Sequence, residues 1–414
     1  ALAWKLLQSE QVQQVFCVPG NGGTATLANC SNLDLAQEDF AAIAQFASSN
    51  AVDLVVVGPE APLAAGITDY LQAQNLTVFG PSQAGAQIEA SKAWAKALMA
   101  EAGIPTAAAR VFTEAEAAIA YVQTYVQTTG APIVVKADGL AAGKGVTVAA
   151  DLDEAIAAIQ ASFGGQFGAA GEQVVIEECL QGQEVSVLAV TDGLTIRPLL
   201  PAQDHKRIGE GDTGANTGGM GAYAPAPIAT PELMARVQRE VLEPALQALR
   251  QRGIDYRGVL YAGLMISPEG DPKVIEFNCR FGDPETQVVL PLLQTPLEQV
   301  LLACAQQNLA DLPPLSWHPG AAASVVVAAP GYPGSYPKGI PIGGLDQAES
   351  QGAVVFHAGT RLKESLVSDG GRVLNVTAVG DSLQQALDNA YRAIDQIQFE
   401  GMYYRRDIGH RALG

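Results

Sequence analysis

A short stretch of the chain, KVIEFNCRFGDPETQ at 273–287, carries the residue types and the spacing that best suit chemistry. Its first half is apolar, β-branched and aromatic around one glutamate, which predicts a β-strand. Because side chains alternate across a strand, Glu276, Asn278 and Arg280 are expected on one face. A carboxylate and an amide oxygen beside a guanidinium suit a Mg²⁺-bound nucleotide and the anion with which it reacts. Taken alone, the stretch fits equally well a strand end with a surface glutamate and an Arg280–Asp283 ion pair.

A second stretch, residues 131–148, predicts two apolar strands that flank a loop of glycine and alanine. Small residues let backbone N–H groups approach phosphates, and Lys144 near the loop tip adds a cation. The loop is not a P-loop, because Gly145 stands where a serine or threonine would bind Mg²⁺ and a strand rather than a helix follows. Lys136 ends the run Ile-Val-Val-Lys, where a buried lysine needs an anionic partner. We therefore favour a phosphate-binding role for Lys136 over a side chain that extends to water.

Two carboxylates accompany the next predicted strand, at 173–176. Glu177 continues that strand, and Glu184 follows a turn at Gly182. The edge of an apolar strand together with a carboxylate is able to hold an adenine and ribose hydroxyls. Without their context these residues are ordinary carboxylates at the edge of a sheet, and that interpretation is favoured until the neighbouring motifs are considered.

A loop rich in glycine and aspartate lies between the motifs QDHKR at 203–207 and NTGGMG at 216–221. Two cations in a strongly acidic chain, followed by a hydroxyl and an amide, indicate a second anionic site. A solvated surface loop is about equally compatible with this composition. Both alternatives stay open.

The first 90 residues predict the elements of a doubly wound α/β unit, with apolar strands that end at loops of glycine and proline. Ligands of open α/β sheets bind at the carboxyl ends of strands, although glycine and proline also punctuate any turn of this kind. The chain opens in a helix at 1–8, where such a domain normally begins with a strand. The other expected elements are strands at 15–18, 53–57 and 76–79 and a helix at 40–48.

The central part of the chain is expected to begin with a helix at 91–102, which carries Lys92 and is closed by a glycine. A long helix at 231–251 has leucine and valine along one side, which is typical of core packing. The strand expected at 259–266 is the natural partner of the strand that carries Glu276.

The composition of the sequence changes at about residue 313, where a proline-rich linker precedes short β segments. A final helix at 382–397 completes what reads as a small α+β domain. Three arginines follow it, Arg405, Arg406 and Arg411. They either close over a substrate or form a solvated basic tail, and the tail is favoured.

The composition bounds the class of protein. At 414 residues the chain has room for about three domains, and its 48% of apolar but only 6% of aromatic residues suit close helix–sheet packing. A formal charge of −19 disfavours nucleic acid and anionic membranes as partners. The five cysteines form no CxxC pair and the four histidines share no ligand spacing, so neither a disulfide framework nor a zinc site is predicted. With no membrane-length apolar run and no visible signal peptide, we expect a cytoplasmic protein. We also expect a monomer, although no pattern in the sequence bears on the oligomeric state.

Four motifs together resemble the phosphoribosylamine–glycine ligases, also called glycinamide ribonucleotide synthetases, of the ATP-grasp superfamily. The resemblance extends from residue 1 to Arg411 with the order and spacing of the family. The last motif is highly specific for these ligases, whereas the glycine loop indicates only the superfamily. The motifs are VKADGLAAGKG at 135–145, QDHKR at 203–207, NTGGMGAY at 216–223 and RFGDPETQ at 280–287.

The resemblance implies a multidomain protein of the α/β and α+β classes. The family normally begins with a strand and a glycine-rich loop ending Gly-Gly-Arg-Glu-His, and this opening is absent from the chain. We therefore expect the N-terminal sheet to lack its first strand, and part of the phosphoribosylamine site to be missing. The implied division is a doubly wound α/β substrate-binding domain at 1–90, an ATP-grasp domain at 91–312 with a small lobe at about 108–180, and a small C-terminal α+β domain at 313–414.

The implied reaction joins ATP, glycine and 5-phosphoribosylamine to give glycinamide ribonucleotide, ADP and phosphate through a glycyl phosphate, in de novo purine synthesis. The required cofactors are ATP and Mg²⁺, with Mn²⁺ as an alternative. The family's motifs imply catalytic roles for Arg280 and Lys144 and a metal-binding role for Glu276 and Asn278. The implied ATP-binding residues are Lys92, Lys136, Lys144, Glu177, Cys179, Leu180 and Glu184. The implied substrate-binding residues are Asp204, Lys206, Asn216, Thr217, Gly218 and Asp283.

Two other functions remain open on the sequence. Another ATP-grasp ligase, either a carboxylase or a different carboxylate–amine ligase of purine synthesis, would use bicarbonate or formate in place of glycine. A nucleotide-binding module without catalysis would bind Mg-ATP and release no ADP. A dehydrogenase is disfavoured, because no G-x-G-x-x-G follows a first strand. The coordination of a second metal ion also stays open, since the strand at 259–266 carries no acid.

Overall fold

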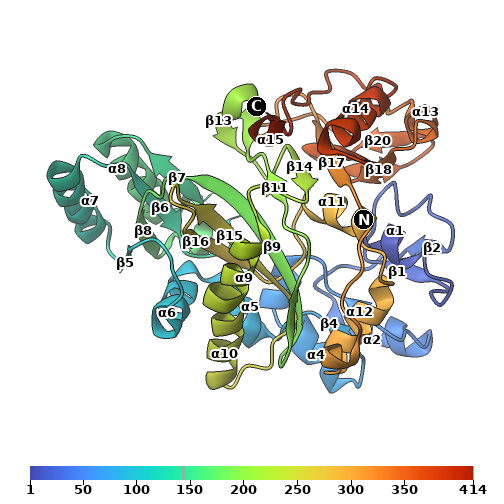
Figure 1. Ribbon diagram of the computed structural model, residues 1–414, viewed down its shortest axis with the longest axis horizontal. Coiled ribbons are helices and arrows are strands. Elements are labelled where there is room, and N and C mark those ends of the chain that lie inside the picture. The colour runs from blue at the N-terminus through green and yellow to red at the C-terminus, as the bar shows by residue number, and fades with distance from the viewer. Residues whose placement is uncertain (142–144, 414) are drawn as a thin grey trace.

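The computed structural model describes residues 1–141 and 145–413. In Figure 1 the N-terminal segment lies on one side of the molecule, a small lobe projects on the opposite side, and the C-terminal segment caps the N-terminal side. Long strands run through the middle of the molecule between these parts (Figure 1). Within the described ranges, no helix combines the length and the apolar content needed to cross a bilayer.

The N-terminal segment forms two separate pairs of parallel strands, β1 with β2 and β3 with β4. The expected strands are confirmed at shorter length, while β2 was not predicted. Side-chain caps start two of the helices, since Asp39 accepts a hydrogen bond from Ala42 N–H and Ser82 accepts one from Gly85 N–H. The elements are α1 (Leu2–Leu6), β1 (Val15–Cys17), β2 (Cys30–Asn32), α2 (Phe40–Ser49), β3 (Val55–Val56), α3 (Glu60–Ala64), α4 (Ile67–Ala73), β4 (Val78–Phe79) and α5 (Gln83–Ala90).

The small lobe is a four-stranded antiparallel sheet in the order β5-β8-β6-β7, packed against two helices. Helix α6 (Lys92–Ala102) leads into it, starting at the Ser91 cap and ending at Gly103, whose φ of +66° favours glycine. The elements of the lobe are β5 (Ala109–Phe112), α7 (Ala115–Thr129), β6 (Ile133–Ala137), β7 (Val146–Ala149), α8 (Leu152–Ala161), η1 (Ser162–Gln166), η2 (Gly168–Gly171) and β8 (Val174–Glu178).

The central sheet has the antiparallel order β10-β9-β15-β16, and the expected pairing of the strand at 259–266 with the strand that carries Glu276 is confirmed. One apolar core lies between this sheet and the helices α5, α6 and α10, and a second core includes α12. The long helix expected at 231–251 is present as three successive helical segments. The elements are β9 (Gln183–Asp192), β10 (Ile196–Pro198), α9 (Pro231–Val237), η4 (Gln238–Leu242), α10 (Glu243–Gln251), β15 (Arg257–Ile266), β16 (Pro272–Asn278), α11 (Thr286–Val289), η5 (Leu290–Leu292), α12 (Leu297–Ala305) and η6 (Leu309–Asp311).

A β-bulge interrupts the pairing of β15 with β16 at Ile275. Gly263 pairs with Glu276 and Leu264 pairs with Val274, so Ile275 has no partner in the ladder. A bulge bends the strand and redirects the side chains that follow it. The bulge therefore affects the direction in which Glu276 and Asn278 leave the sheet, and the pairing from Glu276 to Asn278 is regular again.

The C-terminal sheet has the antiparallel order β11-β14-β17-β21-β18, with α14 packed on one face. Two of its strands, β11 and β14, come from the segment 91–312, so the proposed central and C-terminal domains share one sheet. The elements are β11 (Gln203–Asp204), β12 (Arg207–Gly209), η3 (Glu210–Asp212), β13 (Thr213–Asn216), β14 (Gly221–Ala224), β17 (Ala321–Ala328), α13 (Leu345–Ser350), β18 (Val354–His357), β19 (Thr360–Leu362), β20 (Leu366–Ser368), β21 (Arg372–Gly380), α14 (Leu383–Ile394) and α15 (His410–Leu413).

Candidate active site

A cavity of about 1180 Å³ is lined by residues from the small lobe, the central sheet and the N- and C-terminal segments. It exceeds the roughly 300–1,000 Å³ of typical ligand pockets, so it has room for a nucleotide and a second substrate. Every candidate residue that the structure describes lines this cavity, whereas Lys144 lies outside the described residues. The lining candidates are Lys92, Lys136, Glu177, Cys179, Leu180, Glu184, Asp204, Lys206, Asn216, Thr217, Gly218, Glu276, Asn278, Arg280 and Asp283.

The end of β16 presents Glu276 and Asn278 to the cavity. Burial alone would raise the pKa of the Glu276 carboxyl, but Lys206, Lys136 and Lys92 outweigh that effect and hold the pKa below its usual range. Glu276 is therefore a carboxylate at neutral pH. An ionised carboxylate and an amide oxygen two residues apart are hard oxygen donors that suit a divalent cation.

Arg280 is held by two carboxylates from the N-terminal segment. Its Nε lies 3.0 Å from Glu60 Oε2, and one of its terminal nitrogens, Nη2, lies 3.1 Å from Glu89 Oε1. Burial opposes the charge on Arg280, yet these two carboxylates raise its pKa above the usual value. The alternative of an Arg280–Asp283 ion pair is wrong, since Asp283 instead lies 3.0 Å from Nη2 of Arg372. Arg280 is thus a fixed cation at the cavity wall.

Two buried lysines share one carboxylate at the junction of α6 with the small lobe. Lys136 Nζ lies 3.0 Å and Lys96 Nζ lies 3.2 Å from Glu177 Oε2. Lys136 also donates a hydrogen bond of 3.0 Å to the carbonyl of Ile275, the bulged residue of β16. The alternative in which Lys136 extends to water is wrong, because its side chain is buried within this network.

The first residue of α6 also faces the cavity. Lys92 Nζ donates a hydrogen bond of 3.0 Å to the carbonyl of Gly139, at the start of the glycine loop. Burial lowers the pKa of Lys92, while the carboxylate of Glu276 opposes that shift. This hydrogen bond therefore links the first residue of the glycine loop to the first residue of α6, in the region where the sequence predicts phosphate binding.

The pair Glu184–Lys206 closes another wall of the cavity. Lys206 Nζ lies 2.6 Å from Glu184 Oε2. Burial works against the charge on Lys206, but Glu184, Glu276 and Asp204 raise its pKa well above the usual value. Lys206 is consequently an ammonium group beside the carboxylate of Glu276.

The motif at 216–218 is tied into the fold by hydrogen bonds, whereas most of residues 210–215 before it are exposed, as the alternative of a solvated loop predicts. Thr217 Oγ1 donates a hydrogen bond of 2.9 Å to the carbonyl of Lys206. Arg372 donates to the carbonyl of Gly218 at 2.6 Å and pairs with Asp283 at 3.0 Å. These contacts hold two distant motifs of the sequence against the same side of the cavity.

Three domain models of phosphoribosylglycinamide synthetase match the chain in order. They cover the N domain over residues 1–89, the ATP-grasp (A) domain over residues 90–286 and the C domain over residues 322–411. The chain belongs to the phosphoribosylglycinamide synthetase family. The resemblance found in the sequence is confirmed, and so is the three-part architecture with a central ATP-grasp domain.

Known members of the synthetase family match the chain over nearly its full length. It is 71% identical to the phosphoribosylamine–glycine ligase of Nostoc sp. over 413 residues, which is 99% of this chain and 96% of that protein. It is 60% identical to the same ligase of Synechocystis sp., covering 100% of this chain and 97% of that protein. A crystal structure of the phosphoribosylamine–glycine ligase of Thermotoga maritima superimposes with a TM-score of 0.82 at 33% identity, covering 98% of this chain and 96% of that chain.

Several residues of this synthetase-family site were not predicted as site residues. Glu60, Glu89, Lys96, Glu285 and Arg372 all line the cavity. One signal for Lys96 was present in the sequence, because it lies one helical turn after Lys92 on the same predicted helix. Glu285 lies within the motif at 280–287, whereas Glu60, Glu89 and Arg372 acquire their places through contacts with distant segments.

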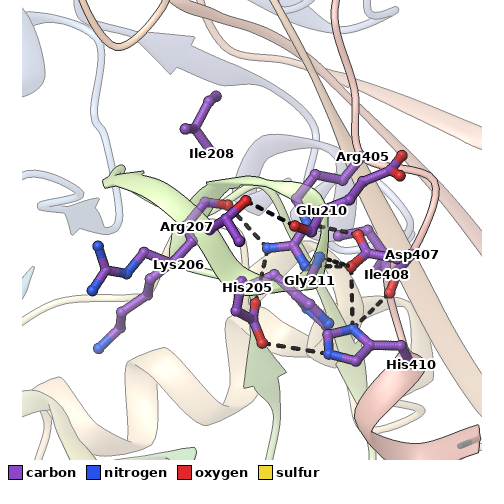
Figure 2. A network of polar contacts seen from close by, with 12 residues as sticks. His205, Lys206, Arg207, Ile208, Glu210, Gly211, Arg405, Asp407, Ile408 and His410 are labelled. Atoms are coloured by element: carbon purple, nitrogen blue, oxygen red, sulfur yellow. Dashed lines mark hydrogen bonds and ion pairs between the residues drawn. The ribbon is translucent and has the colours of Figure 1, made fainter.

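The C-terminal arginines do not form a solvated basic tail. Arg405 is 0% exposed and reaches from the C-terminal segment to the β12–β13 hairpin, as Figure 2 shows. It pairs with Asp212 at 3.0 Å and with Asp407 at 2.7 Å. Arg411 pairs with Asp212 at 2.8 Å and lines the cavity, whereas Arg406 is exposed. The preferred interpretation is therefore wrong for Arg405 and Arg411.

We expect the Arg405→Ala variant to lose about 3 kcal/mol of stability, because it removes a fully buried cation that Asp212 and Asp407 share. Urea-induced unfolding measures the loss. Arg406→Ala is the matched control, since Arg406 is exposed and lies over the ring of Tyr404 at 5.1 Å. The control should change stability by no more than about 0.5 kcal/mol. Equal small effects for the two variants would contradict the structural role of Arg405.

Proposed function

We propose that this chain ligates glycine to 5-phosphoribosylamine with ATP, giving glycinamide ribonucleotide, ADP and phosphate in de novo purine synthesis. The observation that carries the proposal is a single cavity that brings two groups of side chains together. The first is an acid, an amide and a guanidinium from β16 and its end, and the second is the lysines from α6 and β6. The relatives at 71% and 60% identity carry the name phosphoribosylamine–glycine ligase, which supports the same reaction.

The nucleotide occupies the part of the cavity between the small lobe and the central sheet. Lys136 and Lys92 bind its phosphates, as their position at the glycine loop and the bulge of β16 favours. Glu177 Oε1 is buried and has no hydrogen-bond partner among the described residues, which suits an amine donor such as the adenine N6 group. The further proposed contacts of the nucleotide are Lys144, which is assigned from the sequence alone, and Cys179, Leu180 and Glu184.

Glu276 and Asn278 would hold Mg²⁺, or Mn²⁺ in its place. The described residues contain no group of three or more His, Cys, Asp or Glu that could bind a metal by themselves. This fits Mg²⁺ in a nucleotide site, because Mg²⁺ binds there through one or two protein ligands together with phosphate oxygens. The bound cation would neutralise negative charge on the phosphates.

The chemistry needs positioning and charge neutralisation rather than an enzyme nucleophile. A carboxylate oxygen of glycine attacks the γ-phosphorus of ATP, and the bond from that phosphorus to the leaving ADP oxygen breaks. The amine of phosphoribosylamine then attacks the acyl carbon of glycyl phosphate, loses a proton and expels phosphate. Arg280 stabilises the transferring phosphoryl group, and Lys206 orients the glycine carboxylate.

The two small substrates are proposed to lie between β11, the motif at 216–218 and the turn that precedes α11. All the residues assigned to them line the cavity, namely Asp204, Lys206, Asn216, Thr217, Gly218 and Asp283. The domain boundaries at 90 and 312, the monomeric state and the cytoplasmic location stay predictions. Limited proteolysis, light scattering and cell fractionation would test them in turn.

Mass analysis of the products tests the proposed function. The chain is incubated with Mg-ATP, phosphoribosylamine and ¹⁵N-labelled glycine, and we expect ADP, phosphate and a labelled glycinamide product in equal amounts. ADP release that needs bicarbonate or formate instead of glycine would identify another ATP-grasp ligase. Binding of Mg-ATP without any ADP release would identify a nucleotide-binding module and would refute the proposal.

A further inference from the structure

Two buried carboxylates, those of Asp204 and Glu285, meet in the cavity, and the mechanism above gives no role to Glu285. Asp204 on β11 is 8% exposed, and Glu285, which directly precedes α11, is 2% exposed. Both line the cavity. Buried carboxylates normally have a cationic or hydrogen-bonding partner, so the partners of this pair are informative.

Glu285 is anchored through one oxygen only. Its Oε1 accepts a hydrogen bond of 2.6 Å from the hydroxyl of Tyr261 and one of 2.9 Å from Ser186 Oγ. Its Oε2 has no hydrogen-bond partner within the described part of the chain. Gly282 provides room for this oxygen, since a Cβ atom there would lie 2.6 Å from Oε2. One oxygen of Glu285 thus remains available to a ligand.

Asp204 carries a carboxylate that makes no hydrogen bond and no ion pair with any other described residue. It lies close to Glu285 in the fold, because a Cβ atom at Gly219 would lie 3.3 Å from Asp204 Oδ2 and 2.5 Å from a ring carbon of Pro284. Gly219 has a φ of +109° and no side chain, which permits this close approach. Burial and the nearby charge of Glu285 raise the pKa of Asp204 well above its usual range.

The neighbouring cations are already committed to other carboxylates. Lys206 pairs with Glu184 at 2.6 Å, and Arg411 pairs with Asp212 at 2.8 Å. Among the residues that the structure describes, the pair formed by Asp204 and Glu285 therefore lacks a cation of its own. Because leaving charges buried and uncompensated is costly, this corner is suited to a ligand that brings a positive charge.

We propose that Asp204 and Glu285 form the pocket that receives the α-ammonium group of the amino-acid substrate, an inference that rests on the proposed function. An ammonium group has three N–H donors, which match the open oxygens of the two carboxylates better than a metal ion does, since no third carboxylate or histidine completes a cluster among the described residues. The carboxylate of the same substrate then points to Lys206. Glu285 is thereby a specificity residue for glycine.

The consequence is discrimination between glycine and glycolate, which carries a neutral hydroxyl in place of the ammonium group. A site built around a polar group of its substrate rejects analogues without that group by as much as about 10⁴-fold. We expect the wild-type protein to prefer glycine strongly in ADP release. Asp204→Asn and Glu285→Gln should each lower kcat/KM for glycine by about 100-fold and reduce the glycine-to-glycolate ratio at least about tenfold, with KM for ATP near the wild-type value.

Glu298→Gln is the matched control. Glu298 is also a buried carboxylate, 6% exposed, but it accepts a hydrogen bond from Ser9 Oγ at 2.7 Å and does not line the cavity. This variant should keep the wild-type ratio. Glu285→Asp keeps the charge on a shorter side chain and should recover part of the selectivity lost in Glu285→Gln. Thermal melting identifies any variant that does not fold, and the glycine-to-glycolate ratio of the folded variants then tests the proposal.

The proposal is overturned if folded Asp204→Asn and Glu285→Gln keep the wild-type ratio of glycine to glycolate. It is also overturned if they raise KM for ATP or the Mg²⁺ requirement as much as KM for glycine, which would indicate a structural or metal-binding role. The proposal is overturned as well if the wild-type protein does not distinguish glycine from glycolate. A wild-type protein that releases no ADP with either acid would instead refute the proposed function itself.

Discussion

Removal of Arg280 is expected to abolish most of the ligase activity while the fold is retained. Arg280 is fixed by Glu60 and Glu89 at distances of 3.0 and 3.1 Å, so its guanidinium needs no rearrangement when charge develops on the transferring phosphoryl group. Removing one preorganised electrostatic contributor of this kind typically costs about 10²–10³ in rate. We therefore expect Arg280→Ala to lower kcat by about that factor, measured as glycine-dependent ADP release at saturating substrates.

The control for this variant is Arg236→Ala. Arg236 forms a surface ion pair with Glu240 at 3.3 Å and does not line the cavity. Exposed pairs of this kind contribute little to stability, and this one is remote from the chemistry. Near wild-type turnover of Arg280→Ala, with the control unchanged, would remove Arg280 from the catalytic machinery.

Neutralisation of Glu276 is expected to have an effect of similar size. The Glu276→Gln variant keeps the shape of the side chain but loses the ionised carboxylate that faces Lys206, Lys136 and Lys92. It thereby loses a hard ligand for the divalent cation. We expect kcat to fall by about 10²–10³, together with a higher Mg²⁺ concentration for half-maximal activity.

Glu240→Gln tests whether loss of any carboxylate has this effect, because Glu240 is the partner of Arg236 in the same surface pair. Its activity and Mg²⁺ dependence should match those of the wild-type protein. If the Mg²⁺ dependence of Glu276→Gln is also unchanged, Glu276 does not bind the metal.

The sequence by itself determined the chemistry of the site. The spacing of Glu276, Asn278 and Arg280 along an extended segment, the buried lysine at the end of β6 and the glycine loop are local patterns. Local patterns follow from the geometry of a strand and from the conformational freedom of glycine, so they can be read without knowledge of distant contacts. All the described candidates line the same cavity, although their meeting there depends on the packing of distant segments.

Only the tertiary structure decided which partner each charged residue of the site has. Glu60 lies 220 residues before Arg280, and Ser186 lies 99 residues before Glu285, so no local pattern links these pairs. The same holds for Lys96 with Glu177 and for Arg405 with Asp212. The partner of a buried charge is selected by which segments pack together and by the cost of leaving that charge uncompensated. That cost arises only after the chain has folded, which is why the carboxylate pair of Asp204 and Glu285 and the buried C-terminal arginines became visible only in three dimensions.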